Sequence, residues 1–78
     1  MKNFTEEFTI NADFLKEINM DRYERIFDYL EKLRQNGETN MLGAPGYLRE
    51  NYRDLSENEI IDIMDTYIKH YPDIYIKA

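Results

Sequence analysis

The sequence contains no cysteine and no tryptophan, and it has only one histidine, one serine, two prolines and three glycines among its 78 residues. The absence of cysteine excludes disulfide bonds, thiolate metal sites and cysteine catalysis. No apolar run approaches the roughly 18 residues of a membrane-spanning helix. Glu6 and Glu7 lie near the N-terminus, where a signal peptide would be basic and then apolar. These absences predict a cytoplasmic protein without membrane association.

Groups that usually carry catalysis are equally scarce. The single serine, Ser56, begins a Ser-x-x-Glu helix cap, which explains its presence. The single histidine, His70, suits the last turn of a helix and has no co-ligand at metal-binding spacing. Segment 43–46 lacks the spacing and the Lys-Ser/Thr pair of a phosphate loop, and segment 36–40 lacks the alternating ligands of a calcium loop. We therefore expect no enzymatic activity, no cofactor and no metal site.

Acidic residues outnumber basic residues by 16 to 10, which gives a net charge of −6 and a pI near 4.6. Phosphate groups repel such a chain, so direct binding of nucleic acid is disfavoured. The length suits one domain over residues 1–78, and a domain this small buries only roughly 60% of its unfolded surface. Within it we expect a strand and short-helix segment at 1–19, a helical core at 20–72 and a tail at 73–78.

The first half of the chain shows the periodicity of a short strand followed by two helices. Residues 4–10 alternate as a strand does, and Asn11 is placed to cap a short helix that ends near Ile18. The clearest helix spans 21–35, with Asn19 as its expected N-cap and Asn36-Gly37 as its stop. Its apolar residues recur every three or four positions and predict a face toward the core: Met20, Tyr23, Ile26, Phe27, Leu30 and Leu33.

The second half predicts two further helices joined by short connections. Segment 39–46 is expected either to form a corner in which Met41 and Leu42 plug the core, or to be a binding loop. A short helix follows from about residue 45 to Tyr52. The capping box at Ser56 begins the last helix, which Pro72 should end. Residues 73–77 alternate as a strand, which pairs with the N-terminal segment, frays, or docks on a partner. The expected fold class is mainly α, a small three- to four-helix bundle with a short pair of terminal strands. The last helix should bury a wide apolar stripe: Ile60, Ile61, Met64, Tyr67, Ile68 and Tyr71.

Acidic residues form a line on the predicted helix 21–35. Asp21, Glu24, Asp28 and Glu31 are spaced by 3, 4 and 3, which places them on one side of a helix. One interpretation is a solvated face, because Asp21→Arg25, Asp28→Lys32 and Asp65→Lys69 have the spacing of ordinary helix-stabilising pairs. The other is a docking surface for a basic groove. Candidate partner-binding residues are Asp21, Glu24, Asp28 and Glu31, the smaller acidic pair Asp62 and Asp65, the tyrosines Tyr29 and Tyr52, and the loop residue Asn40.

Tyrosine is the commonest aromatic residue, with seven copies. Four of them, Tyr23, Tyr47, Tyr67 and Tyr71, lie on predicted core stripes. Tyr29, Tyr52 and Tyr75 are expected to be exposed, where tyrosine often contributes to interfaces.

The stretch from Tyr23 to Tyr71, about two thirds of the chain, resembles small uncharacterised proteins of bacteriophages and prophages. Two departures from their pattern are Pro45-Gly46 and Tyr67, which replaces a tryptophan. The resemblance implies a phage-like genetic context, and hence the cytoplasm of a host bacterium, without an established activity. The motifs that carry it are Leu33-Arg34-Gln35-Asn36-Gly37, Thr39-Asn40-Met41-Leu42-Gly43-Ala44 and Tyr47-Leu48.

Three classes of function remain open. The leading hypothesis is an interaction protein that modulates or inhibits a protein with a basic surface, such as a nucleic-acid-handling defence enzyme of the CRISPR type. The second is a helix-turn-helix-like domain, although its recognition helix would begin with Glu57, Asn58 and Glu59 rather than with basic residues. The third is an assembly component that associates with itself through the tyrosine-rich helices. The identity of the partner and the oligomeric state are open.

Overall fold

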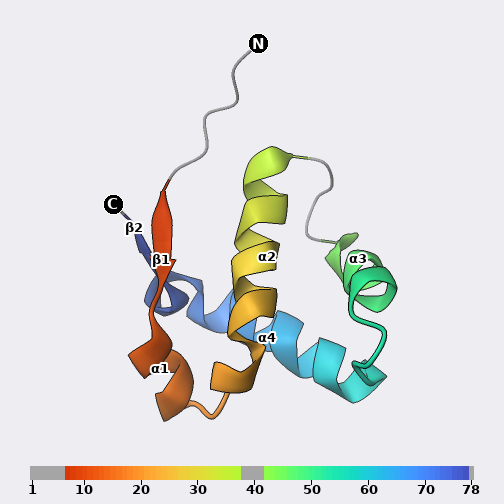
Figure 1. Ribbon diagram of the computed structural model, residues 1–78, viewed down its shortest axis with the longest axis horizontal. Helices are drawn as coiled ribbons and strands as arrows, with labels where there is room; N and C mark the ends of the chain where they lie inside the picture. Colours follow the sequence, from red (N-terminus) through yellow and green to blue (C-terminus); the bar gives the residue numbers. More distant parts are fainter. Residues whose placement is uncertain (1–6, 38–41, 78) are drawn as a thin grey trace.

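Four helices and a two-stranded ribbon make up the computed structural model, which describes residues 7–37 and 42–77 (Figure 1). Helix α2 stands on α4, with α3 on one side and α1 and the ribbon on the other. The expected mainly α fold with a strand pair is confirmed. The elements are β1 (Phe8–Ile10), α1 (Ala12–Glu17), the 3-10 helix η1 (Asp21–Tyr23), α2 (Glu24–Asn36), α3 (Ala44–Asn51), α4 (Glu57–Ile74) and β2 (Tyr75–Lys77).

Three predicted helix ends are confirmed. The Asn11 side chain accepts a hydrogen bond from the Phe14 N–H at 3.2 Å and caps α1. Ser56 and Glu59 form the reciprocal capping box of α4, at 3.1 and 2.9 Å. Gly37 ends α2 with φ of +69°, a conformation that costs glycine little because it has no Cβ.

The predicted role of Asn19 as the N-cap of the second helix is wrong. Asn19 has φ of +60° and terminates α1. The Met20 N–H donates to the Leu15 carbonyl at 2.8 Å, and the Asn19 N–H donates to the Lys16 carbonyl at 3.1 Å. This pair of hydrogen bonds ends a helix at a residue in the left-handed conformation, which asparagine tolerates. Asn19 therefore does mark a helix boundary, but it ends α1 and does not begin the following helix.

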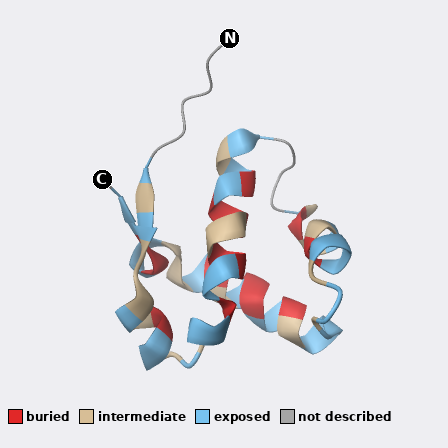
Figure 2. Cartoon of the chain, viewed as in Figure 1, coloured by how far each residue is buried: buried red, intermediate tan, exposed pale blue. Residues whose placement is uncertain are grey.

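The core lies where α2 crosses α4 and along the sides that face α1 and α3 (Figure 2). The predicted apolar face of α2 is confirmed, since its members are buried apart from the partly buried Met20. Phe27 and Leu30 have no exposed surface, and burial of each such side chain contributes about 2 kcal/mol. The fully or nearly fully buried apolar residues from the other elements are Leu15, Ala44, Leu48, Ile60, Ile63, Met64, Tyr67, Ile74 and Tyr75.

Three predictions about apolar residues are wrong. Leu42 is 90% exposed and does not plug the core, which takes Ala44 and Leu48 from α3 instead; Met41 lies outside the described residues. Ile61 and Ile68 of α4 are 61% and 68% exposed, because the buried stripe passes through Ile63 and Met64.

The end of α4 also differs from its prediction. The helix does not stop at Pro72 but breaks at His70, whose φ of −118° and ψ of 20° are not helical. Pro72 then lies in the first turn of a short second segment, where its missing N–H is not needed. This break turns the chain so that Ile74 is buried and β2 can follow at once.

The predicted pairing of the chain ends is confirmed. Strands β1 and β2 are antiparallel, with Phe8 opposite Lys77 and Ile10 opposite Tyr75. Tyr75, which was expected to be exposed, is only 4% exposed, and its hydroxyl donates to the Phe27 carbonyl at 2.6 Å. The ribbon is thereby anchored on α2, which brings Lys77 to the side of that helix.

Candidate functional site

The predicted acidic line on α2 is divided by the fold. Asp21 and Glu24 are exposed, whereas Asp28 is half-buried and forms an ion pair with Lys32 at 3.0 Å. Glu31 is completely buried, so its assignment to a docking surface is wrong. The physical reason is its position one turn after Phe27, at the edge of the apolar face, where the C-terminal residues cover it. Asp21 and Arg25 form no ion pair, although both belong to the described part of the chain.

The acidic pair on α4 is exposed together with apolar residues. Asp65 forms an ion pair with Lys69 at 3.2 Å, and both side chains are more than half exposed. Ile61, Asp65 and Ile68 follow each other at intervals of four and three, so they lie along one line of the helix. We refer to Ile61, Asp62, Asp65 and Ile68, all exposed, as the α4 face.

Tyr29 and Tyr52 are less available than their prediction supposed. Both are half-buried and pack against the core. Their rings meet edge to face at 5.6 Å, and Asn51 donates to the Tyr29 hydroxyl at 3.2 Å. They therefore join α2 to the end of α3. Asn40 lies outside the described residues.

The arrangement that sequence patterns did not predict is a polar cluster around the buried Glu31. Arg34 donates from Nε and Nη2 at 3.1 and 2.8 Å, and Gln35 donates at 3.0 Å. The Tyr71 hydroxyl and Lys77 Nζ donate at 2.7 and 2.8 Å, and the Tyr67 hydroxyl lies at 3.4 Å. Residues from α2, α4 and β2 thus meet on one carboxylate. The spacing of Glu31, Arg34 and Gln35, with Phe27 one turn earlier, was the available signal.

The hydrogen bonds in this cluster keep the Glu31 carboxyl group ionised. Burial alone would raise the pKa of Glu31, but the hydrogen bonds from Arg34, Gln35, Lys77 and Tyr71 outweigh it and lower the pKa to about 2. The carboxylate in turn raises the pKa of Arg34. Burial raises the pKa of Tyr67, so its hydroxyl keeps its proton. At neutral pH the cluster therefore holds an ionised carboxylate beside the guanidinium of Arg34.

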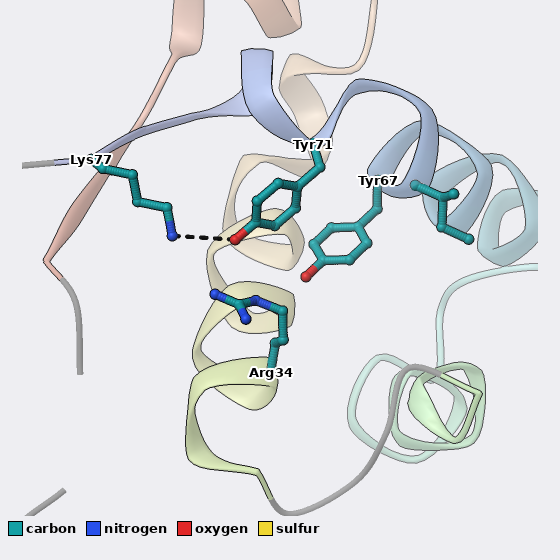
Figure 3. A pocket seen from close by; sticks show the side chains of 5 residues that line it. Arg34, Tyr67, Tyr71 and Lys77 are labelled. Atoms are coloured by element: carbon teal, nitrogen blue, oxygen red, sulfur yellow. Dashed lines mark hydrogen bonds between the residues drawn. The ribbon is translucent and has the colours of Figure 1, made fainter. Parts of the chain in front are cut away.

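An open pocket of about 540 Å³ lies over this cluster. Arg34, Tyr67, Ile68, Tyr71 and Lys77 line it. Figure 3 shows the Arg34 guanidinium below the hydroxyl ends of Tyr67 and Tyr71, with the Lys77 side chain extending toward the Tyr71 hydroxyl. The guanidinium carbon and Lys77 Nζ each lie 5.5 Å from the centre of the Tyr71 ring. Cationic and aromatic groups are thus brought together in a protein that is acidic overall.

The start of α4, which would be the recognition helix of a helix-turn-helix, is occupied by contacts within the chain. Glu57 accepts two hydrogen bonds from Arg49 of α3, at 2.8 and 2.9 Å. Glu59 caps its own helix and accepts a hydrogen bond from the Tyr23 hydroxyl at 2.7 Å. The pKa values of both carboxyl groups are lowered, Glu57 by its hydrogen bond from Arg49 and Glu59 by its backbone bond to Ser56. This end of α4 is therefore anionic, and its carboxylates are engaged in contacts with α3 and with Tyr23.

Residues 7–37 and 42–77 contain no group of three or more histidine, aspartate or glutamate side chains placed to hold a metal ion. No helix in these ranges is long and apolar enough to cross a membrane. In comparisons with known proteins, the chain matches no family model, no curated protein and no solved structure. The resemblance to phage proteins therefore stays a prediction.

Proposed function

We propose that this chain is a small interaction protein that docks through the α4 face on the basic surface of another protein and modulates its activity. The observation that carries the proposal is the exposure of two isoleucines, at 61% and 68%, on one line of a well-packed helix. They flank Asp65 and adjoin Asp62. Isolated exposed apolar side chains are ordinary, but two on the same helix line beside acids suit recognition.

The chemistry of the α4 face favours a partner with apolar pockets inside a basic groove. Helix recognition uses anchors at intervals of about one and two turns, which is the spacing of Ile61, Asp65 and Ile68. Asp62 forms no ion pair with the described residues, so its charge is available to a partner. The net charge of −6 would also steer the encounter and make it sensitive to salt.

A nucleic-acid-handling enzyme is the class of partner that fits best, because its groove for phosphate is basic and lined with arginine or lysine. Occupation of that groove by an acidic protein would inhibit the enzyme. The phage-like pattern of the sequence supports a defence enzyme of a host bacterium, a CRISPR effector being one instance. Direct binding of nucleic acid is disfavoured, since Glu57 and Glu59 stand where a recognition helix needs donors.

Affinity capture from the encoding organism's lysate, with and without nuclease, tests this proposal. The wild type should retain one protein in stoichiometric amount after nuclease treatment. The variant Asp62→Lys/Asp65→Lys should lose it. The control Glu17→Lys/Asp54→Lys makes the same change in net charge at exposed positions away from the α4 face and should retain it.

Three outcomes would contradict the proposal. Equal loss in both variants would mean that net charge alone drives binding. Recovery of nucleic acid without a protein would favour the helix-turn-helix alternative. Recovery of the chain bound only to itself would favour an assembly component.

A further inference from the structure

Arg34 presents two different edges. Its Nε and Nη2 atoms bond the two oxygens of Glu31, which fixes the plane of the guanidinium. Its Nη1 atom has no hydrogen-bond partner within residues 7–37 and 42–77, and the side chain is 41% exposed. Because a guanidinium offers five N–H donors in a fixed fork, the outer edge can bind a second planar anion in the same way.

The cluster also holds more donors than Glu31 can use well. Six donor contacts converge on its two oxygens, whereas a carboxylate has about four lone-pair sites. The Tyr67 hydroxyl, at 3.4 Å, is the most distant donor, and Tyr67 is one of the residues that line the pocket. Glu31 therefore does not use all of the donors around it at full strength.

The remaining walls suit an apolar body. The Tyr67 and Tyr71 rings meet edge to face at 5.4 Å, and Ile68 adds an exposed aliphatic side chain. The pocket, of about 540 Å³, is open to solvent, so a ligand would be held by contacts on one side only.

We propose that this pocket binds the carboxylate of an organic acid that has an apolar or aromatic body. The carboxylate would lie on the outer edge of Arg34, and the body would lie mainly against Tyr71 and Ile68, because Tyr67 is almost completely buried. A monoanion is favoured over a phosphate dianion, since the buried charge of Glu31 stands directly behind Arg34. This site shares Ile68 with the α4 face, but its other lining residues lie outside that face, so ligand binding does not require the proposed docking.

Titration of the ¹⁵N-labelled full chain followed by NMR tests the proposal. The probes are 3-phenylpropionate, its neutral amide 3-phenylpropionamide, and N-acetyl-phenylalanine as the end of a peptide. Both carboxylates should shift the Arg34 Nε–Hε signal and the amides of residues 67–71, and the amide probe should not. Tighter binding of N-acetyl-phenylalanine would identify a peptide terminus as the source, and equal or weaker binding would identify a free small acid.

Two substitutions of equal chemistry provide the control. Ile68→Asp places a carboxylate at the pocket rim and should weaken binding of 3-phenylpropionate by roughly tenfold or more. Ile61→Asp, at a similarly exposed position outside the pocket, should leave the affinity unchanged. Docking of a protein on the α4 face should suffer from both changes, so the two proposals fail separately.

Equal shifts with the acid and its amide would overturn the proposal, because the charge would then have no role. The absence of shifts at Arg34 at millimolar probe would overturn it as well. So would equal affinities of the Ile68→Asp and wild-type chains.

Discussion

At the scale of single residues, Glu31 joins parts of the chain that are far apart in sequence. Its neighbours Arg34 and Gln35 come from α2, whereas Tyr71 comes from the last part of α4 and Lys77 comes from β2. A buried carboxylate is tolerated only where donors replace its water. The cluster therefore specifies how the C-terminal residues dock on α2. One buried acceptor in it, Gln35 Oε1, has no partner among the described residues.

Replacement of Glu31 by glutamine should destabilise the fold by roughly 3 kcal/mol, because Arg34 and Lys77 would lose their shared anion. Urea unfolding followed by circular dichroism measures this loss. Glu24→Gln is the matched control on the exposed side of the same helix and should change the free energy of unfolding by less than about 0.5 kcal/mol. Equal effects of the two substitutions would show that the cluster contributes no stability.

The lowered pKa of Glu31 predicts a dependence of stability on pH. The folded pKa is about 2 against an ordinary value of 4.5, so the stabilisation is fully present above pH 4.5 and is lost as the pH falls toward 2. The difference amounts to about 3 kcal/mol at 1.36 kcal/mol per pKa unit. The gap in unfolding free energy between the wild type and Glu31→Gln should therefore narrow over this range. A gap that stays constant down to pH 2 would contradict the prediction.

At the scale of elements, two glycines test how the helix ends are determined. Gly37 has a positive φ and Gly46 lies inside α3, and a Cβ added to either meets no atom within 4 Å. Gly37→Ala should cost about 1 kcal/mol through backbone strain. Gly46→Ala should stabilise by about 0.5 kcal/mol through helix propensity and a less flexible unfolded chain. Thermal unfolding measures both, and shifts of the same sign would refute this account of the two positions.

Sequence spacing predicted most of the helices. It failed for the burial of residues at the edges of the apolar helix faces. Spacing and the glycine stop identified α2, and the capping box identified the start of α4, because these features are contained within a few neighbouring residues. The burial of Glu31 depends on what covers the edge of α2, which is decided by residues 36 to 46 positions later. The break at His70 likewise depends on the burial of Ile74 and Tyr75 in the core, which follow it in the chain. Of the predicted site, Asp62 and Asp65 lie on the exposed α4 face, whereas the polar cluster and its pocket were not predicted.

At the scale of the whole molecule, charge is distributed unevenly. Acids occupy the α4 face and the start of α4, whereas Arg34 and Lys77 gather at the pocket. The proposed docking surface is therefore anionic, whereas the proposed ligand pocket holds two basic side chains.

Binding through the α4 face should weaken with ionic strength. Between about 0.05 M and 0.5 M salt the screening length falls from over 10 Å to roughly 4 Å, so the association rate should fall while the dissociation rate changes less. Surface plasmon resonance with the captured partner measures both rates. If salt changed only the dissociation rate and left the association rate constant, long-range steering would be contradicted.

Site-specific photo-crosslinking can determine whether the α4 face contacts a protein partner. A photoreactive residue replaces Ile61 in one chain and the exposed Glu17 in another, and each is irradiated in lysate after nuclease treatment. If the α4 face docks on a partner, one protein should crosslink from position 61. Unlabelled wild type should displace it, and the Asp62→Lys/Asp65→Lys variant should not. Crosslinks of equal yield from position 17, or none from position 61 while a partner still co-purifies, would contradict docking through the α4 face.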